Sequence, residues 1–109
     1  MSRAAIETWD RNAPHYDAQE RLEARALDTA HRLAGLRSDD TLVDVGTGTG
    51  LLLRRAAAGR PRPARAIGVD RSEGMLAEMR ELPAGWSVVV ADAAAVPLDD
   101  GCADVVTCA

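Results

Sequence analysis

The sequence predicts an α/β fold, a three-layer and doubly wound parallel sheet with helices packed against it. Four short apolar runs, rich in valine, alternate with segments whose apolar residues recur at helical spacing. This alternation is typical of βαβ units, and right-handed crossovers then predict the strand order 3-2-1-4. Ligands of such sheets bind at the carboxyl ends of the strands, at the switch point between strands one and four.

Strands and helices follow one another in regular order along the chain. Strands are expected at 41–45, 66–70, 86–91 and 103–108, and helices at 3–12, 21–36 and 49–58. Gly59 stands at the C-cap of the third helix. A fourth helix should follow Ser72, which can cap it, with Glu73 in its first turn. The apolar face of the second helix would consist of Leu22, Leu27, Ala30, Leu33 and Ala34.

A glycine turn joins the first strand to its helix, in the segment from Val43 to Gly50. Gly46 and Gly48 allow a sharp turn and let a ligand approach the main chain closely. The N–H groups of the helix start would then face that ligand. A dinucleotide fingerprint needs a third glycine at position 51, which is Leu51 here. The turn therefore predicts a nucleotide-like ligand of another class.

Two further acids stand where such a ligand would need them. Asp70 ends the second strand, 20 residues after Gly50, and can accept hydrogen bonds from both hydroxyls of a ribose. Asp92 and Ala93 follow the third strand, where a carboxylate and a neighbouring N–H could read the edge of an adenine. Each acid alone is an ordinary strand-end residue. Together with the glycine turn, they predict a binding site for a nucleoside.

The D-x-G-x-G-x-G pattern from Asp44 to Gly50 resembles motif I of the class I S-adenosylmethionine-dependent methyltransferases. Residues 68–76, 91–98 and 104–108 resemble later segments of the family that includes the ubiquinone/menaquinone C-methyltransferases, methyltransferase type 11. The resemblance implies a Rossmann-like fold, S-adenosylmethionine as cofactor and methyl transfer to a small-molecule acceptor. It does not identify that acceptor.

The resemblance also implies two regions, an N-terminal helical lid at 1–37 and an incomplete cofactor-binding domain at 38–109. Trp9-Asp10, Ala13 and Tyr16-Asp17 look like the family's lid. The Tyr16 hydroxyl could reach the methionine end of the cofactor, or Tyr16 could simply plug the space between helix and sheet. His15 is expected to be an exposed polar residue, and no catalytic residue is assigned.

The predicted cofactor-binding set is Tyr16, Asp44, Gly46, Thr47, Gly48, Asp70, Arg71, Asp92 and Ala93. Asp44 has two interpretations: it orients the glycine turn by accepting its N–H groups, or it faces the ammonium of the cofactor. Arg71 could stack on adenine or face solvent. The sulfonium of the cofactor carries the reactivity, so the protein's task is alignment.

Composition narrows the class of protein further. The chain has 109 residues, 47% of them hydrophobic, and a formal net charge of −4, which argues against a nucleic-acid partner. No apolar stretch reaches the length of a membrane span or signal peptide, so a cytoplasmic location is expected. Cys102 and Cys108 are expected to be reduced thiols, and no metal site is predicted. With three aromatic residues, the core should be weakly stabilised.

The sequence ends inside or just after the fourth predicted strand, whereas the resembled family continues. A fragment of a longer protein, an engineered truncation and a chain completed by a partner remain open. The free edge of strand four is an expected site of self-association. Three functions are weighed: a small-molecule methyltransferase, a cofactor-binding fragment without catalysis, and an NAD-linked oxidoreductase. Asp70 would suit NAD equally, but Leu51 and Asp92-Ala93 count against it.

Overall fold

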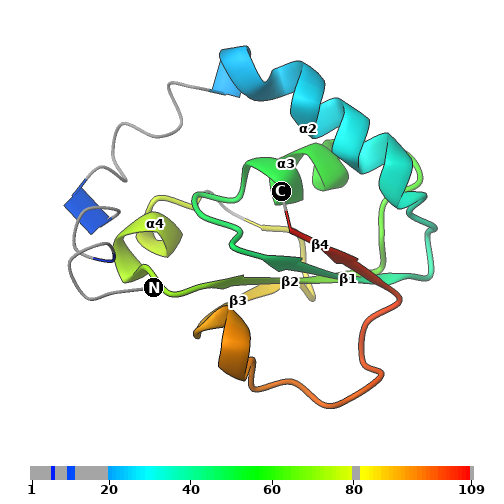
Figure 1. Ribbon diagram of the computed structural model, residues 1–109. Helices are drawn as coiled ribbons and strands as arrows, with labels where there is room; N and C mark the ends of the chain where they lie inside the picture. Colours follow the sequence, from blue (N-terminus) through cyan, green and yellow to red (C-terminus); the bar gives the residue numbers. More distant parts are fainter. Residues whose placement is uncertain (1–5, 7–9, 12–19, 80–81, 109) are drawn as a thin grey trace.

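A computed structural model describes residues 6, 10–11, 20–79 and 82–108, which form a parallel sheet with helices on it (Figure 1). The strands are β1 (Thr41–Val45), β2 (Arg65–Asp70), β3 (Ser87–Val90) and β4 (Val105–Thr107). Their order is β3-β2-β1-β4, and every neighbouring pair is parallel. The predicted fold class and strand order are therefore confirmed.

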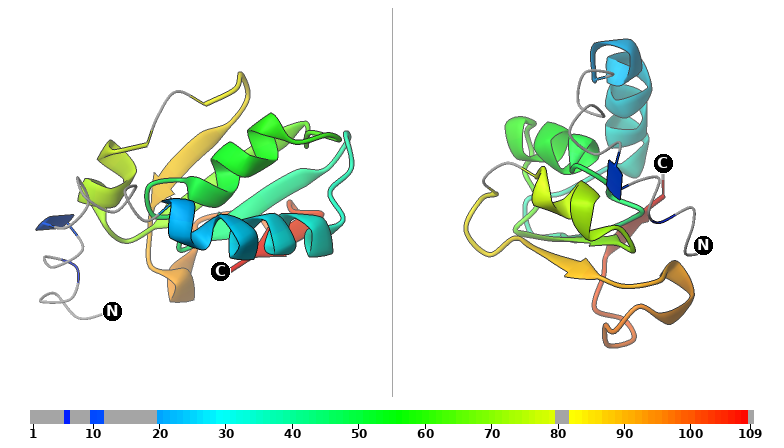
Figure 2. Two further views of the ribbon diagram at one scale, coloured as in Figure 1. Left: turned by 90° about the horizontal axis from the view of Figure 1, so that it is seen from above. Right: turned by 90° about the vertical axis from the view of Figure 1, so that its left-hand side faces the viewer.

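The helices gather on one face of the sheet. They are α2 (Glu20–Ala34), α3 (Leu51–Ala58) and α4 (Glu73–Ala77), with the 3-10 helix η2 (Ala93–Ala95) in the connection between β3 and β4. Figures 1 and 2 show α2, α3 and α4 above the sheet, while η2 and the loop to β4 lie below it. Among the described residues, the third layer of the fold thus consists of a single turn and a loop.

Helix boundaries follow the local chemistry of their ends. The helix predicted from Thr49 begins at Leu51, because the N-cap Gly50 adopts a left-handed φ of 82°. Gly59 closes α3 with an extended backbone, and its N–H donates to the Arg55 carbonyl at 3.0 Å. Ser72 caps α4 as predicted, accepting a hydrogen bond from the Met75 N–H, and Glu73 lies in the first turn.

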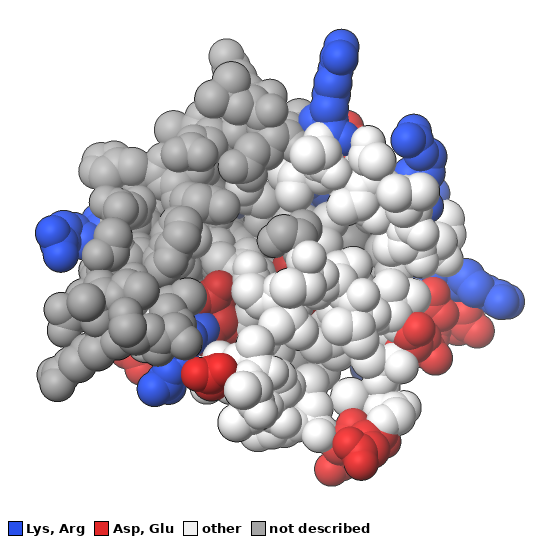
Figure 3. Space-filling model, viewed as in Figure 1, with Lys and Arg blue, Asp and Glu red and all other residues white. Residues whose placement is uncertain are grey.

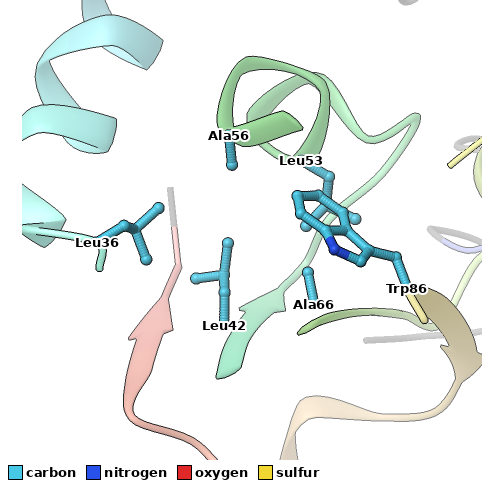
Figure 4. Packing of buried hydrophobic residues seen from close by; sticks show 6 residues of the cluster. All are labelled: Leu36, Leu42, Leu53, Ala56, Ala66 and Trp86. Carbon is cyan, nitrogen blue, oxygen red and sulfur yellow. The ribbon is translucent and has the colours of Figure 1, made fainter. Parts of the chain in front are cut away.

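The main core lies between α3 and the sheet. It consists of Leu36, Leu42, Leu53, Ala56, Ala66 and Trp86. Figure 4 shows the indole of Trp86 reaching over Ala66 to Leu53, so one large ring fills the space between these two residues. Trp86 is buried although it precedes β3 rather than belonging to it. Such a ring buries a large apolar area, which matters in a core otherwise built from aliphatic side chains.

The apolar face of α2 is narrower than predicted. Leu27 is buried against Leu51 and Leu52 of α3, with Ala30 beside them. Leu33, expected on the same face, is 78% exposed, because the 3.6-residue period carries it away from the stripe that starts at Leu27. The side chain of Leu22 lies outside the described residues.

The opposite face of the sheet is only partly covered. Its buried residues are Val43, Val69 and Ala91, packed by half-buried apolar side chains of β1, β2, β3 and the loop before β4. A hollow of about 320 Å³ remains there, lined mainly by Val43, Val45, Val96, Leu98 and Val106 and by residues 99–103. Val106 is 62% exposed. None of the predicted cofactor residues lines this hollow.

Two kinds of feature are absent from the described part of the chain. No helix in it is both long and apolar enough to cross a membrane. No group of three or more His, Cys, Asp or Glu side chains in it could hold a metal ion. Cys102 and Cys108 are free and exposed.

Candidate functional site

The glycine turn after β1 is fastened to the end of β2. The N–H groups of Gly46 and Thr47 both donate to the Val69 carbonyl, at 2.8 and 2.9 Å. The Gly48 N–H donates to Oδ2 of Asp70 at 2.9 Å. The chain itself therefore uses these three amides of the turn. A ligand at the turn would therefore meet the bare Cα surface rather than these three donors.

Each glycine of the turn has its own reason to lack a side chain. Gly46, Gly48 and Gly50 all have positive φ, at 74°, 59° and 82°. A Cβ on Gly48 would lie 2.9 Å from Met75 Cε, and one on Gly50 would lie 2.9 Å from Met79 Cε. A Cβ on Gly46 would meet nothing within 4 Å. Gly48 and Gly50 therefore face the methionines that follow Ser72, and Gly46 is the member that faces open space.

Asp70 stands at the carboxyl end of β2, half-buried, as the sequence predicted. Its Oδ2 accepts the Gly48 N–H, and its Oδ1 accepts the Ser72 N–H at 2.9 Å. A carboxylate oxygen has two lone pairs, so both oxygens keep acceptor capacity for ligand hydroxyls. The two backbone donors fix the orientation of the carboxylate before any ligand arrives.

Asp44 lies inside β1 and is only 3% exposed. The Thr107 hydroxyl of β4 donates to its Oδ1 at 2.7 Å. Burial raises the pKa of Asp44, the hydrogen bond from Thr107 opposes that rise, and the charge of Asp70 adds to it. The amides of Gly46, Thr47 and Gly48 go to other acceptors, so Asp44 does not hold the turn through these three amides.

Thr47 points into the sheet. A Cβ on Gly68 of β2 would lie 2.8 Å from Thr47 Cγ2, so the side chain covers that glycine. The Thr47 hydroxyl lowers the pKa of Asp44, yet within the described residues Thr47 Oγ1 has no partner at hydrogen-bonding geometry. Thr47 therefore shapes the turn from inside.

Asp92, Ala93 and Arg71 lie at the same edge of the sheet. Val90 pairs with Asp70, which places Asp92 just beyond the end of β3. Oδ1 of Asp92 accepts the Ala94 N–H at 2.9 Å, and this bond lowers the pKa of Asp92, helped by the charge of Arg71. Ala93 and Arg71 are exposed. The structure thus brings the predicted acids of three strand ends to one edge.

The structure adds a residue to which the sequence gave no role in the site. Asp10 accepts hydrogen bonds from the Ser72 hydroxyl and from the Gly74 N–H, the second at 2.9 Å, and these two bonds lower the pKa of Asp10. A glycine in the first turn of a helix is a weak choice energetically, so Gly74 could have signalled a close backbone approach. Tyr16, also predicted for the site, lies outside the described residues.

This arrangement fits a nucleoside that also carries a positive charge. Asp70 offers oriented acceptors for hydroxyls, and Asp44 is a buried carboxylate whose charge a cation would stabilise. The open space beside Gly46 admits a ligand against the main chain. The described residues of the site can therefore bind and orient such a ligand.

Comparisons with known proteins show which family the chain resembles. A family model described as a methyltransferase domain matches residues 42–109. A ubiquinone/menaquinone biosynthesis C-methyltransferase from Syntrophotalea carbinolica is 40% identical in an alignment 73 residues long, which covers 62% of this chain and 30% of that protein.

Solved structures share the fold. One is a chain of the complex between the Haloferax volcanii Trm112 methyltransferase activator and a methyltransferase, with a TM-score of 0.75, 27% identity, and 84% of this chain and 42% of that one covered. Another is a phosphoethanolamine N-methyltransferase of Haemonchus contortus, crystallised with phosphoethanolamine and S-adenosylhomocysteine. It has a TM-score of 0.65 and 20% identity, and covers 97% of this chain and 25% of that one. The chain spans less than half the length of each of these three proteins.

Proposed function

Because the chain belongs to the methyltransferase domain family, we propose that it binds S-adenosylmethionine as the cofactor-binding part of a methyltransferase. The observation that carries this proposal is the carboxylate of Asp70, fixed by the amides of Gly48 and Ser72 at the end of β2. An acid in this place is suited to hold the two hydroxyls of a ribose.

The other residues of the predicted set would each contact a different part of the cofactor. Asp44 is the candidate partner for the ammonium of the methionine part, because a cation would offset the cost of its buried charge. Gly46 would let that part of the cofactor pass close to the main chain. Asp92 and Ala93 would face the adenine edge, with Arg71 beside them.

When bound, the cofactor supplies a methyl group on a sulfonium, which a nucleophilic acceptor atom can displace. The contribution of this chain is to bind and orient. Two fixed carboxylates and a glycine turn that the chain's own hydrogen bonds hold in place provide that orientation without reorganisation on binding. No residue of this chain is assigned as a base.

A small-molecule acceptor is part of the proposal. The Syntrophotalea protein is named for ubiquinone and menaquinone synthesis, and the net charge of −4 argues against a nucleic-acid substrate. A cytoplasmic location belongs to the same proposal. The 109 residues alone are expected to bind the cofactor without transferring its methyl group.

The NAD hypothesis loses support from the surroundings of Leu51. This residue, at the place of the third dinucleotide glycine, is 4% exposed and packs against Leu27 of α2. In a dinucleotide-binding turn, the third glycine lets the helix pack closely against the strand, and here a leucine side chain occupies that position.

Calorimetric titration tests the proposal with S-adenosylmethionine, S-adenosylhomocysteine and NAD. We expect the first two to bind and NAD not to bind. Asp70→Ala should weaken binding of the first two by roughly tenfold or more, because charged hydrogen bonds contribute roughly 1.5–3 kcal/mol. The control is Asp99→Ala, an exposed carboxylate on the loop before β4. Equal affinities of the two variants, both folded, would refute the assignment of Asp70 to the ribose.

A further inference from the structure

Asp10 connects the N-terminal part of the chain to the candidate site. Two groups donate to the same oxygen of its carboxylate, Oδ1: the hydroxyl of Ser72 and the N–H of Gly74. Ser72 is fully buried, with 0% exposure. The sequence separation between Asp10 and Ser72 is 62 residues, so this is a tertiary contact rather than a local cap.

Hydrogen bonds continue from Ser72 into the site. The Ser72 N–H donates to Oδ1 of Asp70 at 2.9 Å, and Oδ2 of Asp70 accepts the Gly48 N–H at 2.9 Å. The Ser72 hydroxyl also accepts the Met75 N–H at 3.2 Å, which begins α4. An unbroken series of hydrogen bonds therefore runs from Asp10 through Ser72 and Asp70 to Gly48 of the glycine turn.

Gly74 provides a second and independent observation. A Cβ on Gly74 would lie 2.7 Å from Cα of Asp10 and 2.9 Å from its carbonyl oxygen. Those atoms belong to the backbone, so they cannot move aside as the end of a side chain can. The backbone of Asp10 therefore approaches α4 so closely that only glycine fits at position 74, although glycine weakens a helix.

We propose that Asp10 is a positioning residue of the cofactor site, which acts through Ser72 to hold Asp70 and the glycine turn in the geometry that binds a ribose. The contact of Asp10 with α4 and the binding of the cofactor then strengthen each other. Both favour the same arrangement of Ser72 and Asp70. Asp10 need not touch the cofactor. The identity of the ligand in this inference rests on the proposed function. The coupling between Asp10 and Gly48 does not depend on it.

The first test measures affinity for S-adenosylhomocysteine by calorimetry. Asp10→Ala removes both acceptor contacts and should weaken binding by about tenfold, within the usual range of coupling between sites. Asp10→Asn keeps an acceptor oxygen for Ser72 and Gly74 and should restore most of the affinity. In an Asp70→Ala background, Asp10→Ala should have little further effect on the affinity, because the Asp70 carboxylate that links Ser72 to the ligand is already absent. An undiminished effect in that background would overturn the proposal.

The second test needs no ligand and follows hydrogen exchange of the Gly48 and Ser72 amides. Both should exchange faster in Asp10→Ala, and also in Gly74→Ala, which displaces Asp10 without removing a polar group. Unchanged exchange at Gly48, or an equal increase at the β1 and β2 amides, would overturn the coupling. Faster local exchange in a chain that binds no S-adenosylhomocysteine, even as wild type, would support the coupling and refute the proposed function instead.

Discussion

The aspartates at the ends of β1 and β2 have different surroundings, and the difference decides what each can do. Asp44 is buried and receives one hydroxyl, so its charge is poorly stabilised and its pKa is raised. Asp70 is half-buried and receives two backbone N–H groups, which hold it as an oriented acceptor. A ligand with hydroxyl groups near Asp70 and a positive charge near Asp44 would interact favourably with both carboxylates.

The raised pKa of Asp44 leads to a prediction on pH. A carboxyl whose pKa is higher in the folded state stabilises the fold below its ordinary pKa, and that contribution is lost as pH rises through the folded value. At neutral pH the buried charge therefore destabilises the ligand-free chain. Asp44→Asn keeps an oxygen for Thr107 and should raise the urea midpoint at neutral pH, while weakening S-adenosylmethionine binding by about tenfold.

Affinity as a function of pH separates the two roles of Asp44. Binding by the wild type should weaken as pH falls through the raised pKa of this carboxyl, because its protonated form cannot attract an ammonium. Asp44→Asn should remove that dependence, and the exposed control Asp99→Asn should keep it. If the urea midpoint of Asp44→Asn is lower than that of the wild type, and the affinity of this variant still depends on pH, Asp44 has a structural role only.

Gly46 gives a test with a closely matched control. Gly46 and Gly85 both have positive φ, at 74° and 84°, and a Cβ on either would meet nothing within 4 Å. Alanine at either position should therefore cost about 1–2 kcal/mol of backbone strain and leave the fold intact. Only Gly46→Ala should abolish cofactor binding in titration, because only Gly46 lies beside the predicted ligand. Equal affinities of the two variants would show that the turn is a connector.

At the scale of elements, sequence patterns predicted the strands and helices whose formation depends on neighbouring residues. Valine-rich runs located all four strands, and helical spacing located α2 and α3. Boundaries were less accurate where one residue decides them, as at Gly50, whose left-handed backbone delays the start of α3. Leu33 was assigned to the buried face of α2 because it is apolar, but an exposed leucine on a helix is ordinary.

The candidate site was predictable as a set of strand ends but not as a set of contacts. Topology alone brings Asp44, Asp70 and Asp92 to one edge. Several contacts of the site join residues far apart in the sequence: Thr107 is 63 residues from Asp44, Gly48 is 22 residues from Asp70, and Ser72 is 62 residues from Asp10. No periodicity reports such pairs. For the same reason, the sequence could not show that the amides of the turn are already in use.

At the scale of the whole molecule, the two faces of the sheet differ in cover. Among the described elements, helices α2, α3 and α4 cover one face, and η2 and its loop lie on the other (Figures 1 and 2). β4 pairs with β1 alone in the described sheet, so its outer edge presents unpaired backbone groups. Figure 3, in the view of Figure 1, shows mostly uncharged atoms from the centre to the right of the molecule, with acidic and basic side chains around them.

These features predict that the 109-residue chain alone associates with itself, unfolds at low denaturant and transfers no methyl group. Val106 is 62% exposed on the open edge strand, so Val106→Lys should shift the mass measured by light scattering toward the monomer. Leu33→Lys, at a site 78% exposed on α2, should leave the association unchanged. Adding strands that pair with β4 should give a single species and tighter S-adenosylmethionine binding. A monomeric mass, a sharp cooperative melt and tight binding by residues 1–109 alone would show that the free edge of β4 is harmless and that this part of the fold is sufficient by itself.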